Sequence, residues 1–403
     1  MVKKIIASLL FLIVLSCIGA FFYLQASYPT LSPMTTVSIY SERFTHPRLK
    51  LKQEVFGFLP YWQLDQIPNI QLQNLSHIDY FSLSVGSDGH ILKEINGETD
   101  PGWLNWNKKE VQNLFIKAKI IETKTSVSIT ALDNDTIRNL LQYQDNQINL
   151  ITDIVDLAKK YQLDNINIDF EYFGNPEPGH DIAFTQFSRE LKSTLKQENL
   201  NTQLTLSIMP LSARNKSIFA FDKLVPIYDR FIGMSYEYYS AGSDIAGPTA
   251  PMKGFKEQKY FFDVETTYND YLKFLPKEKI IMGVPYYGRE WAVLEGKKQN
   301  SETLSADDPN SYAGVVSYAR AKESKDIIKE QCKWDKLAQE TWCWYKDKES
   351  GTDRQLWIAD DTSIRTRYTF AKQKQFAGVA IWTLGYDKQY NNLWDMIKNI
   401  FSK

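Results

Sequence analysis

The sequence predicts an α/β fold, a (β/α)8 (TIM) barrel with a small insertion after its seventh strand. Eight short apolar runs follow one another from residue 54 onward, and amphipathic helical patterns separate most of them. Strands that alternate with helices imply a parallel sheet with right-handed crossovers. Eight such units over roughly 350 residues match a closed barrel. An open doubly wound sheet is the alternative, but no glycine-rich phosphate fingerprint follows the first run.

The individual elements follow from these patterns. The runs expected to form strands are 54–62, 77–85, 125–132, 164–171, 203–210, 230–237, 279–288 and 376–385. The clearest helical patterns are Lys108–Lys119, Ile148–Tyr161, Ile182–Gln197 and Thr366–Lys374. The segment 291–360 is too long for one helix, and we expect it to be an insertion that contains short antiparallel strands. The whole barrel should then occupy residues 54–403.

The N-terminus predicts export. Lys3 and Lys4 precede an apolar run from Ile5 to Leu24, which is about as long as a membrane span and follows the positive-inside rule. We expect residues 1–26 to be a membrane anchor or a signal peptide. A lipoprotein site at Cys17 is a third interpretation and a buried helix a fourth. The first three place the remainder outside the cytoplasm, either membrane-anchored or secreted.

Export changes how the cysteines are interpreted. Cys332 and Cys343 are the only cysteines outside the apolar run, and in an exported chain we expect them to form a disulfide. Two free thiols are the alternative. Residues 27–53 are rich in Ser, Thr and Pro without periodicity and predict a linker or stalk.

The composition limits the function classes. A formal net charge of -1 provides no overall field to attract nucleic acid, so no nucleic-acid partner is expected. Aromatic residues reach 14% of the chain, which suits either a sugar-binding cleft or an aromatic-rich core. The four histidines show no ligand spacing and no cysteine cluster exists, so we expect neither a metal nor a cofactor.

The stretch "DNINIDFE" at 164–171 contains the candidate site. On a strand, alternate side chains share one face, so Asn167, Asp169 and Glu171 lie together. A half-exposed surface strand would show the same alternation, and a buried structural network is another alternative. In a barrel, however, inward-facing acids at a strand's carboxyl end are typical of an active site.

This stretch resembles the D-G-x-D-x-D-x-E signature of glycoside hydrolase family 18, which includes chitinases and peptidoglycan-acting glucosaminidases. Asp164, Asp169 and Glu171 match the signature, whereas Asn165 replaces its Gly and Asn167 its middle Asp. The resemblance continues through "FGFLPYW", "MSYE", "KIIMGVPYYGREW" and "GVAIWTLGYD", but the third strand lacks the usual S-x-G-G ending. It implies substrate-binding roles for Asn167, Phe58, Met234, Glu237, Tyr287, Arg289 and Trp382.

The resemblance also implies a mechanism. Glu171 would protonate the glycosidic oxygen, and the substrate's own acetamido oxygen would attack the anomeric carbon. Asp169 would accept the acetamido N–H, and Tyr236 would hold the acetamido oxygen. The expected substrate is a β-1,4-linked N-acetylglucosamine polymer, either chitin or peptidoglycan, or an N-glycan. A non-catalytic, lectin-like sugar binder is the alternative, and a scaffold with a vestigial barrel is a weaker one.

Two structural details follow from the same resemblance. Family members often hold the tryptophan at the end of the eighth strand in a cis peptide, so we expect one between Trp382 and Thr383. Asn167 removes one carboxyl from the usual motif. We expect its amide to donate to Asp169 and to keep Asp169 ionised over a wide pH range.

Overall fold

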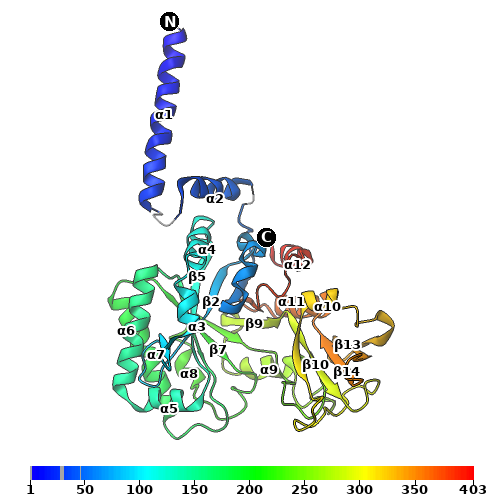
Figure 1. Ribbon diagram of the computed structural model, residues 1–403. Coiled ribbons are helices and arrows are strands. Elements are labelled where there is room, and N and C mark those ends of the chain that lie inside the picture. Colours follow the sequence, from blue (N-terminus) through cyan, green and yellow to red (C-terminus); the bar gives the residue numbers. More distant parts are fainter. Residues whose placement is uncertain (1, 28–30, 46) are drawn as a thin grey trace.

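Eight parallel strands close into a barrel in this computed structural model, which describes residues 2–27, 31–45 and 47–403 (Figure 1). The strands follow the order β1-β15-β9-β8-β7-β6-β5-β2. They are β1 (Glu54–Pro60), β2 (His77–Ser84), β5 (Lys124–Ala131), β6 (Asn165–Phe170), β7 (Gln203–Ile208), β8 (Arg230–Gly233), β9 (Ile280–Pro285) and β15 (Gly378–Trp382). Each coincides with a predicted run to within a few residues, so the predicted barrel is confirmed.

One predicted strand is too long. β8 ends at Gly233, where the prediction continued the strand to Glu237. The neighbouring β7 ends at Ile208, shortly before Pro210, which has no N–H to extend the ladder. After Gly233 the chain leaves the strand and turns, and Glu237 adopts a left-handed backbone with φ of 58°. The side chains from Met234 to Glu237 therefore do not alternate as strand residues would.

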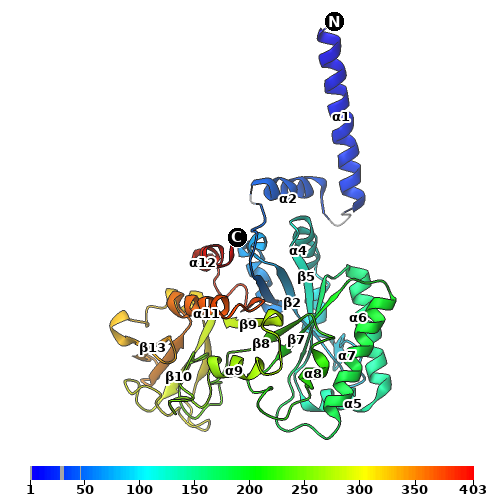
Figure 2. The ribbon, with the colours of Figure 1, turned by 180° about the vertical axis from the view of Figure 1, so that it is seen from behind.

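Helices surround the barrel, and Figure 2 shows α5, α6 and α7 along one side of it. The described helices that cover or connect the strands are α3 (Pro101–Trp106), α4 (Lys109–Ile120), α5 (Asn134–Gln142), α6 (Gln144–Tyr161), α7 (His180–Gln197), α8 (Phe221–Leu224), α9 (Val264–Tyr271), α10 (Tyr318–Glu323), α11 (Asp361–Lys374) and α12 (Asn392–Phe401). Short 3-10 turns are η1 (Tyr61–Asn69), η2 (Leu72–Asn74), η3 (Lys277–Lys279) and η4 (Lys329–Gln331), and β3 (Glu94–Ile95) pairs with β4 (Glu98–Thr99).

The four predicted helices exist, but three begin earlier than predicted. For α11 the reason is a capping box. The Asp360 carboxylate accepts from the backbone N–H of Ser363 at 2.9 Å, and Ser363 Oγ accepts from the Asp360 N–H at 2.8 Å. This reciprocal pair satisfies N–H groups that a helix start leaves without partners. Apolar periodicity marks only the buried face of a helix, so it misses such polar first turns.

The segment 27–53, predicted to be a linker, contains a helix that the sequence did not lead us to expect, α2 (Pro33–Thr45). Ser32 caps it, because its hydroxyl accepts from the Thr35 N–H at 3.1 Å. Ile39 is buried, and Arg43 donates to the Ile120 carbonyl at 3.1 Å, so α2 packs beside the end of α4. Serine followed by proline at a helix start was the signal that the sequence offered.

Helix α1 (Val2–Ser27) precedes α2 and projects away from the barrel (Figure 1). Within the described ranges, no helix meets the length and apolarity needed to cross a membrane. The anchor or signal peptide expected at 1–26 therefore remains a prediction.

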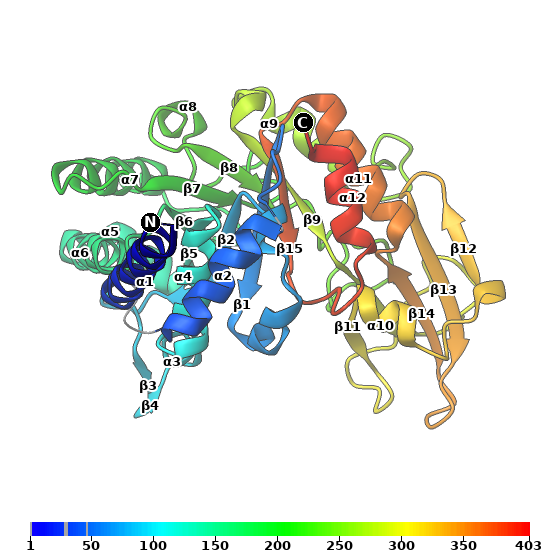
Figure 3. The same cartoon turned by 90° about the horizontal axis from the view of Figure 1, so that it is seen from above.

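The insertion is a five-stranded antiparallel sheet in the order β11-β10-β14-β13-β12, set to one side of the barrel (Figure 3). Its strands are β10 (Tyr287–Val293), β11 (Ala313–Ser317), β12 (Cys332–Asp335), β13 (Glu340–Lys346) and β14 (Asp353–Ile358). Cys332 lies directly opposite Cys343 and is bonded to it, which confirms the predicted disulfide. A buried ion pair of 2.6 Å between Arg367 of α11 and Glu340 of β13 fastens the sheet to the barrel.

The inside of the barrel has a polar half. Six buried side chains from β2, β5, β6 and β7 form a closed circuit of hydrogen bonds, here named the lumen ring: Asp79, Ser126, Ser128, Asn165, Asn167 and Thr205. The Asp79 carboxylate accepts from both serines, and the bond from Ser128 Oγ is 2.6 Å long. Every hydroxyl donor in the ring is thereby satisfied.

The asparagines complete the ring. Asn165 Nδ2 donates to Ser126 at 2.8 Å and to Thr205 at 3.0 Å. Thr205 donates to Asn167 Oδ1 at 2.9 Å, and Asn167 Nδ2 donates to Ser128 at 3.1 Å. The other half of the lumen is apolar and consists of Phe56, Phe58, Phe81, Ile232, Ile281 and Ala380. The barrel interior is thus divided into a hydrogen-bonded side and an aromatic side.

Asp79 should make stability depend on pH. Burial raises the pKa of its carboxyl to about 7, although both serines lower it. The native state then holds a proton that the unfolded chain releases above about pH 4, so stability falls as the pH rises from there to about 7. Asp79→Asn should remove this loss, which amounts to at most roughly 4 kcal/mol.

Urea unfolding of the native chain and of Asp79→Asn at pH 4 and at pH 7 measures this difference. Asp307→Asn is the matched control, because Asp307 is exposed and the substitution changes the net charge by the same amount. An equal loss of stability between the two pH values in the native chain and in Asp79→Asn would contradict the assignment.

Candidate active site

Strand β6 brings the predicted acids to the barrel mouth. Ile168 and Phe170 point outward and are buried, and Phe170 packs against Phe184 and Phe187 of α7 with ring centroids 5.9 and 6.0 Å apart. The strand is therefore covered on its apolar face, and its polar face lines the lumen. This arrangement excludes the half-exposed surface strand that the alternation alone left open.

Asp169 lies above the lumen ring, and its side chain receives no hydrogen bond from the described residues. Its side chain is 3% exposed, and its Oδ1 is a buried acceptor without a hydrogen bond. Burial, the Glu171 carboxyl and the Asp79 carboxyl raise the pKa of Asp169 well above its usual range. A buried oxygen that receives no hydrogen bond costs free energy, and a ligand donor that reached it would remove that cost.

The role expected for Asn167 is wrong in its geometry. Its Nδ2 donates to Ser128 at 3.1 Å and to Ser207 at 3.0 Å, so both amide hydrogens are used within the lumen and neither reaches Asp169. Asp169 consequently receives no bond that favours its ionised form, and its pKa is raised, contrary to the expectation of a wide ionised range. Serines on the flanking strands outcompete Asp169 because they face the same layer of the lumen.

Glu171 begins the loop that follows β6. Its backbone N–H donates to the Ala131 carbonyl at 2.9 Å, which continues the β5–β6 ladder by one residue and fixes the start of the side chain. Glu171 is only partly buried and lines a cavity of about 530 Å³. Burial and the nearby Glu237 raise the pKa of Glu171. The carboxyl therefore keeps its proton to a higher pH than an exposed glutamate does.

Tyr236 lies near these acids, and Trp382 lies against Tyr236. Their rings are stacked with centroids 6.4 Å apart and an interplanar angle of 12°. Phe58 contacts Trp382 edge-on at 5.8 Å, from the apolar half of the lumen. The peptide bond between Trp382 and Thr383 is cis, as predicted. Burial and the charges of Asp169, Glu171 and Glu237 raise the pKa of Tyr236 well above its usual range, so it remains a hydrogen-bond donor.

The remaining predicted residues hold Glu237 in place. Tyr287 Oη donates to Glu237 Oε1 at 2.9 Å, and Arg289 Nη2 donates to the same oxygen at 3.0 Å. Tyr287 also packs against Tyr236, with ring centroids 6.3 Å apart. Met234, Tyr236 and Glu237 line the cavity together with Glu171. Residues that follow β6 and β8 thus converge with residues of β10 at the carboxyl ends of the barrel strands.

Sequence reasoning missed four aromatic residues and one acid near this site. Phe173 and Phe261 line the cavity and are 58% and 56% exposed. Phe81 packs edge-on to Trp382 at 4.6 Å, and the exposed Trp62 packs on Phe81 at 6.1 Å. Phe173 and Phe261 lie in loops, which carry no periodic signal, so no sequence pattern could identify either of them. Asp79 had a detectable signal, since it is an acid inside an apolar strand run.

No metal centre accompanies these residues. Within the described ranges, no group of three or more His, Cys, Asp or Glu side chains could hold a metal ion. The chemistry available at the site is that of two adjacent carboxyls, a phenol and an aromatic wall.

Comparison with known proteins assigns the chain to a family. The sequence profile of Glycosyl hydrolases family 18 matches residues 54–387. The chain belongs to glycosyl hydrolase family 18. The match includes the barrel and the inserted sheet, so all the predicted site residues lie within the family 18 region.

Individual relatives are distant. A cortical fragment-lytic enzyme of Bacillus subtilis (strain 168) is 25% identical over 283 residues, which are 69% of this chain and 59% of that enzyme. An endochitinase of Manduca sexta is 22% identical over 343 residues, 80% of this chain and 60% of the endochitinase. The chain therefore spans less than two thirds of these curated relatives. The crystal structure of the Bacillus megaterium spore cortex-lytic enzyme SleL shares the fold, with a TM-score of 0.66 at 21% identity over 88% of this chain and 75% of that chain.

The charge of Glu237 should affect the pH at which Glu171 loses its proton. Burial and the negative charge of Glu237 raise the pKa of Glu171, and Glu237→Gln removes that charge, so the pKa of Glu171 should fall. In a pH profile of kcat/KM for hydrolysis, the basic limb should move to lower pH by the same amount. Glu349→Gln, an equal change of charge at an exposed turn of the inserted sheet, should leave the profile unchanged. A basic limb that stays in place in Glu237→Gln would refute this coupling.

Proposed function

We propose that the chain is a retaining glycoside hydrolase that cleaves polysaccharide containing β-1,4-linked N-acetylglucosamine by substrate-assisted catalysis. The observation that carries the proposal is the buried, unpartnered Oδ1 of Asp169, two residues before Glu171 at a strand end. An unpaired buried acceptor costs about 1–3 kcal/mol. The 2-acetamido N–H of the sugar supplies the missing donor and recovers that free energy.

Glu171 is the proposed general acid. Two carboxyls in one desolvated site do not ionise together easily, so the Asp169–Glu171 pair retains a proton to a higher pH than an exposed carboxyl does. Glu171 lines the open cavity, whereas Asp169 is almost wholly buried. The proton that reaches the glycosidic oxygen therefore comes from Glu171, and the leaving sugar departs as an alcohol.

The nucleophile is the substrate. Asp169 and Glu171 come from one strand face and so lie on one side of the bound sugar, whereas an ordinary retaining pair flanks the ring from both sides. The acetamido oxygen instead attacks the anomeric carbon and forms an oxazolinium ion. Tyr236 donates a hydrogen bond that holds this oxygen, and the Asp169 carboxylate stabilises the positive charge. Glu171, now ionised, takes a proton from water, which opens the intermediate with retention.

The aromatic half of the lumen is the proposed sugar floor. The Trp382 ring is held by edge-on contacts with Phe58 and Phe81 and would receive the apolar face of the sugar. The exposed rings of Phe173 and Phe261 border the cavity and supply further stacking positions. The names of the relatives point to two substrate classes, chitin and the peptidoglycan of the spore cortex, and both contain N-acetylglucosamine.

A lectin-like sugar binder is the second candidate function. It would use the same aromatic floor and the same Asp169 acceptor, but it would have no need of a proton donor. The partly buried Glu171, with its raised pKa, favours the enzyme.

We further propose that the protein acts outside the cytoplasm, attached to a membrane or secreted. The disulfide between Cys332 and Cys343 supports this location, because such bonds persist in oxidising compartments. The exposed apolar side chains of α1, such as Leu10 and Phe11, support attachment.

Glu171→Gln tests the proposal most simply. The variant should bind chitooligosaccharides as the native chain does but lose turnover by about 10²–10⁴-fold, since an amide cannot donate the proton. Mass spectrometry of products from chitooligosaccharides and from purified peptidoglycan measures turnover and names the substrate. Glu349→Gln should retain full activity. Near-native turnover in Glu171→Gln would refute the mechanism, and binding without turnover in the native chain would establish the lectin-like alternative.

A further inference from the structure

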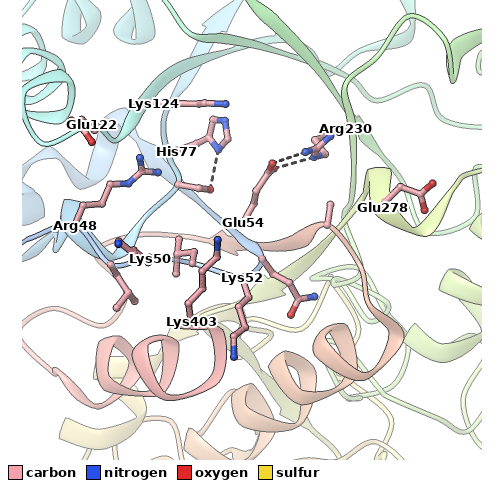
Figure 4. Close-up of a pocket in the computed structure, with 15 residues that line it drawn as sticks. Arg48, Lys50, Lys52, Glu54, His77, Glu122, Lys124, Arg230, Glu278 and Lys403 are labelled. Atoms are coloured by element: carbon pink, nitrogen blue, oxygen red, sulfur yellow. Dashed lines mark hydrogen bonds and ion pairs between the residues drawn. The ribbon is translucent and has the colours of Figure 1, made fainter.

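A second cavity lies at the opposite end of the barrel from Glu171, where the strands begin. It has a volume of about 550 Å³ and is lined by the segment 48–54 and by the first residues of several barrel strands (Figure 4). Its cationic side chains are Arg48, Lys50, Lys52, Lys124, Arg230 and Lys403. Three carboxylates accompany them, those of Glu54, Glu122 and Glu278. The lining therefore has an excess of positive charge in a chain whose formal net charge is -1.

Two of the three carboxylates are already engaged by cations. Glu54 binds Arg230 through both oxygens, at 2.6 and 3.1 Å. Glu122 forms a salt bridge with Arg43 of α2, which does not line the cavity, and its charge also acts on Arg48. The third, Glu278, is exposed. These pairs leave most of the cationic side chains of the cavity without a carboxylate of their own.

The unpaired cations come together in space. Figure 4 shows Arg48 and Lys50 of the segment 48–54 and Lys403 of the last residues around the cavity. Arg48 Nε is buried without a hydrogen-bond partner, and the Lys124 ammonium donates only to the neutral Gln203 Oε1, at 2.8 Å. A desolvated guanidinium donor without an acceptor is costly, and an anionic ligand would satisfy it.

The pKa of His77, on the cavity wall, reflects its burial and the positive charges around it. Burial and the positive charges of Lys124, Arg230 and Arg48 lower the pKa of His77 to about 3. His77 is therefore neutral, and its Nδ1 bonds to Ser76 Oγ at 2.9 Å. Three cations from separate segments thus act on one point, which is the electrostatic condition for capturing an anion.

We propose that this cavity is a binding site for a phosphate-ester anion. A guanidinium fork and several ammonium groups match the multiple oxygens of a tetrahedral phosphate, and its charge offsets the excess of the lining. The cavity has room for the phosphate together with a small esterified alcohol. The ligand chemistry is shared by free glycerol phosphate and by the headgroup of a phospholipid.

The surroundings allow either source. Helix α2 lies over this end of the barrel, and α1, with its exposed apolar side chains, projects from the same side (Figure 1). A lipid headgroup bound here would orient the cavity that contains Glu171 away from the lipid surface. The proposal does not rest on the proposed hydrolase function, because the two cavities share no lining residue.

Calorimetric titration of the full chain with glycerol phosphate tests the site. The native chain should bind with a dissociation constant below about 1 mM, and affinity should fall with added salt. The double variant Lys50→Glu/Lys403→Glu should bind at least 10-fold more weakly. Lys50→Gln/Lys403→Gln, which removes charge without reversing it, should show an intermediate loss and guards against a folding defect. Lys336→Glu/Lys346→Glu, with the same change of net charge on the inserted sheet, is the control and should bind as the native chain does.

Vesicles distinguish the two sources. Phosphatidylglycerol vesicles should displace glycerol phosphate if the headgroup is the ligand, whereas phosphatidylcholine vesicles should not, because the choline offsets the phosphate charge. Absence of displacement by both would assign the site to the soluble ester. Equal affinity for glycerol phosphate in the native chain and in both cavity variants, or no binding by the native chain, would overturn the proposal.

Discussion

The lumen ring is the interaction on which the site depends. An acid and five neutral polar side chains occupy the inside of a barrel that would otherwise fill with apolar residues, and each finds its partner on a neighbouring strand. Because these bonds join β2, β5, β6 and β7, they fix the register of the strands as well as the ring. Asp79 accepts at the centre of this network and has no cation beside it. Such an arrangement is costly for folding, and the Asp79 carboxyl adds to the burial and to the Glu171 charge that raise the pKa of Asp169 above it.

The division of the lumen then sets the chemistry. The polar half lies below Asp169 on the same strand face, and the apolar half packs against Trp382 through Phe58. A sugar seated at this mouth would meet hydrogen-bonding groups on one side and ring faces on the other. Asn167 belongs to the ring and contributes no charge at the mouth. Asp79 therefore supplies the second buried carboxyl that acts on Asp169, from a different strand.

Sequence reasoning recovered the barrel because strand burial and helix amphipathicity leave periodic signals. It also placed Asp169 and Trp382 near the carboxyl ends of their strands, where the structure has them. Glu171 and Tyr236 follow β6 and β8, and the catalytic roles of these residues stay a prediction. Sequence reasoning missed what depends on contacts between distant segments: helix α2, whose burial requires α4, and the partners of Asn167, which are chosen by the flanking strands. The inserted sheet was predicted as antiparallel strands, but the pairing of Arg367 with Glu340 could not be read from either segment alone.

The proposed mechanism depends most on one hydrogen bond, which the acetamido N–H of the substrate should donate to Asp169 Oδ1. A crystal structure of Glu171→Gln with a bound chitooligosaccharide measures it directly, since that variant should bind without cleaving. The account predicts the acetamido nitrogen within about 3.2 Å of Asp169 Oδ1, with the same sugar ring over Trp382. A sugar bound in the cavity with its acetamido group turned away, and with Asp169 Oδ1 still unpartnered, would contradict it.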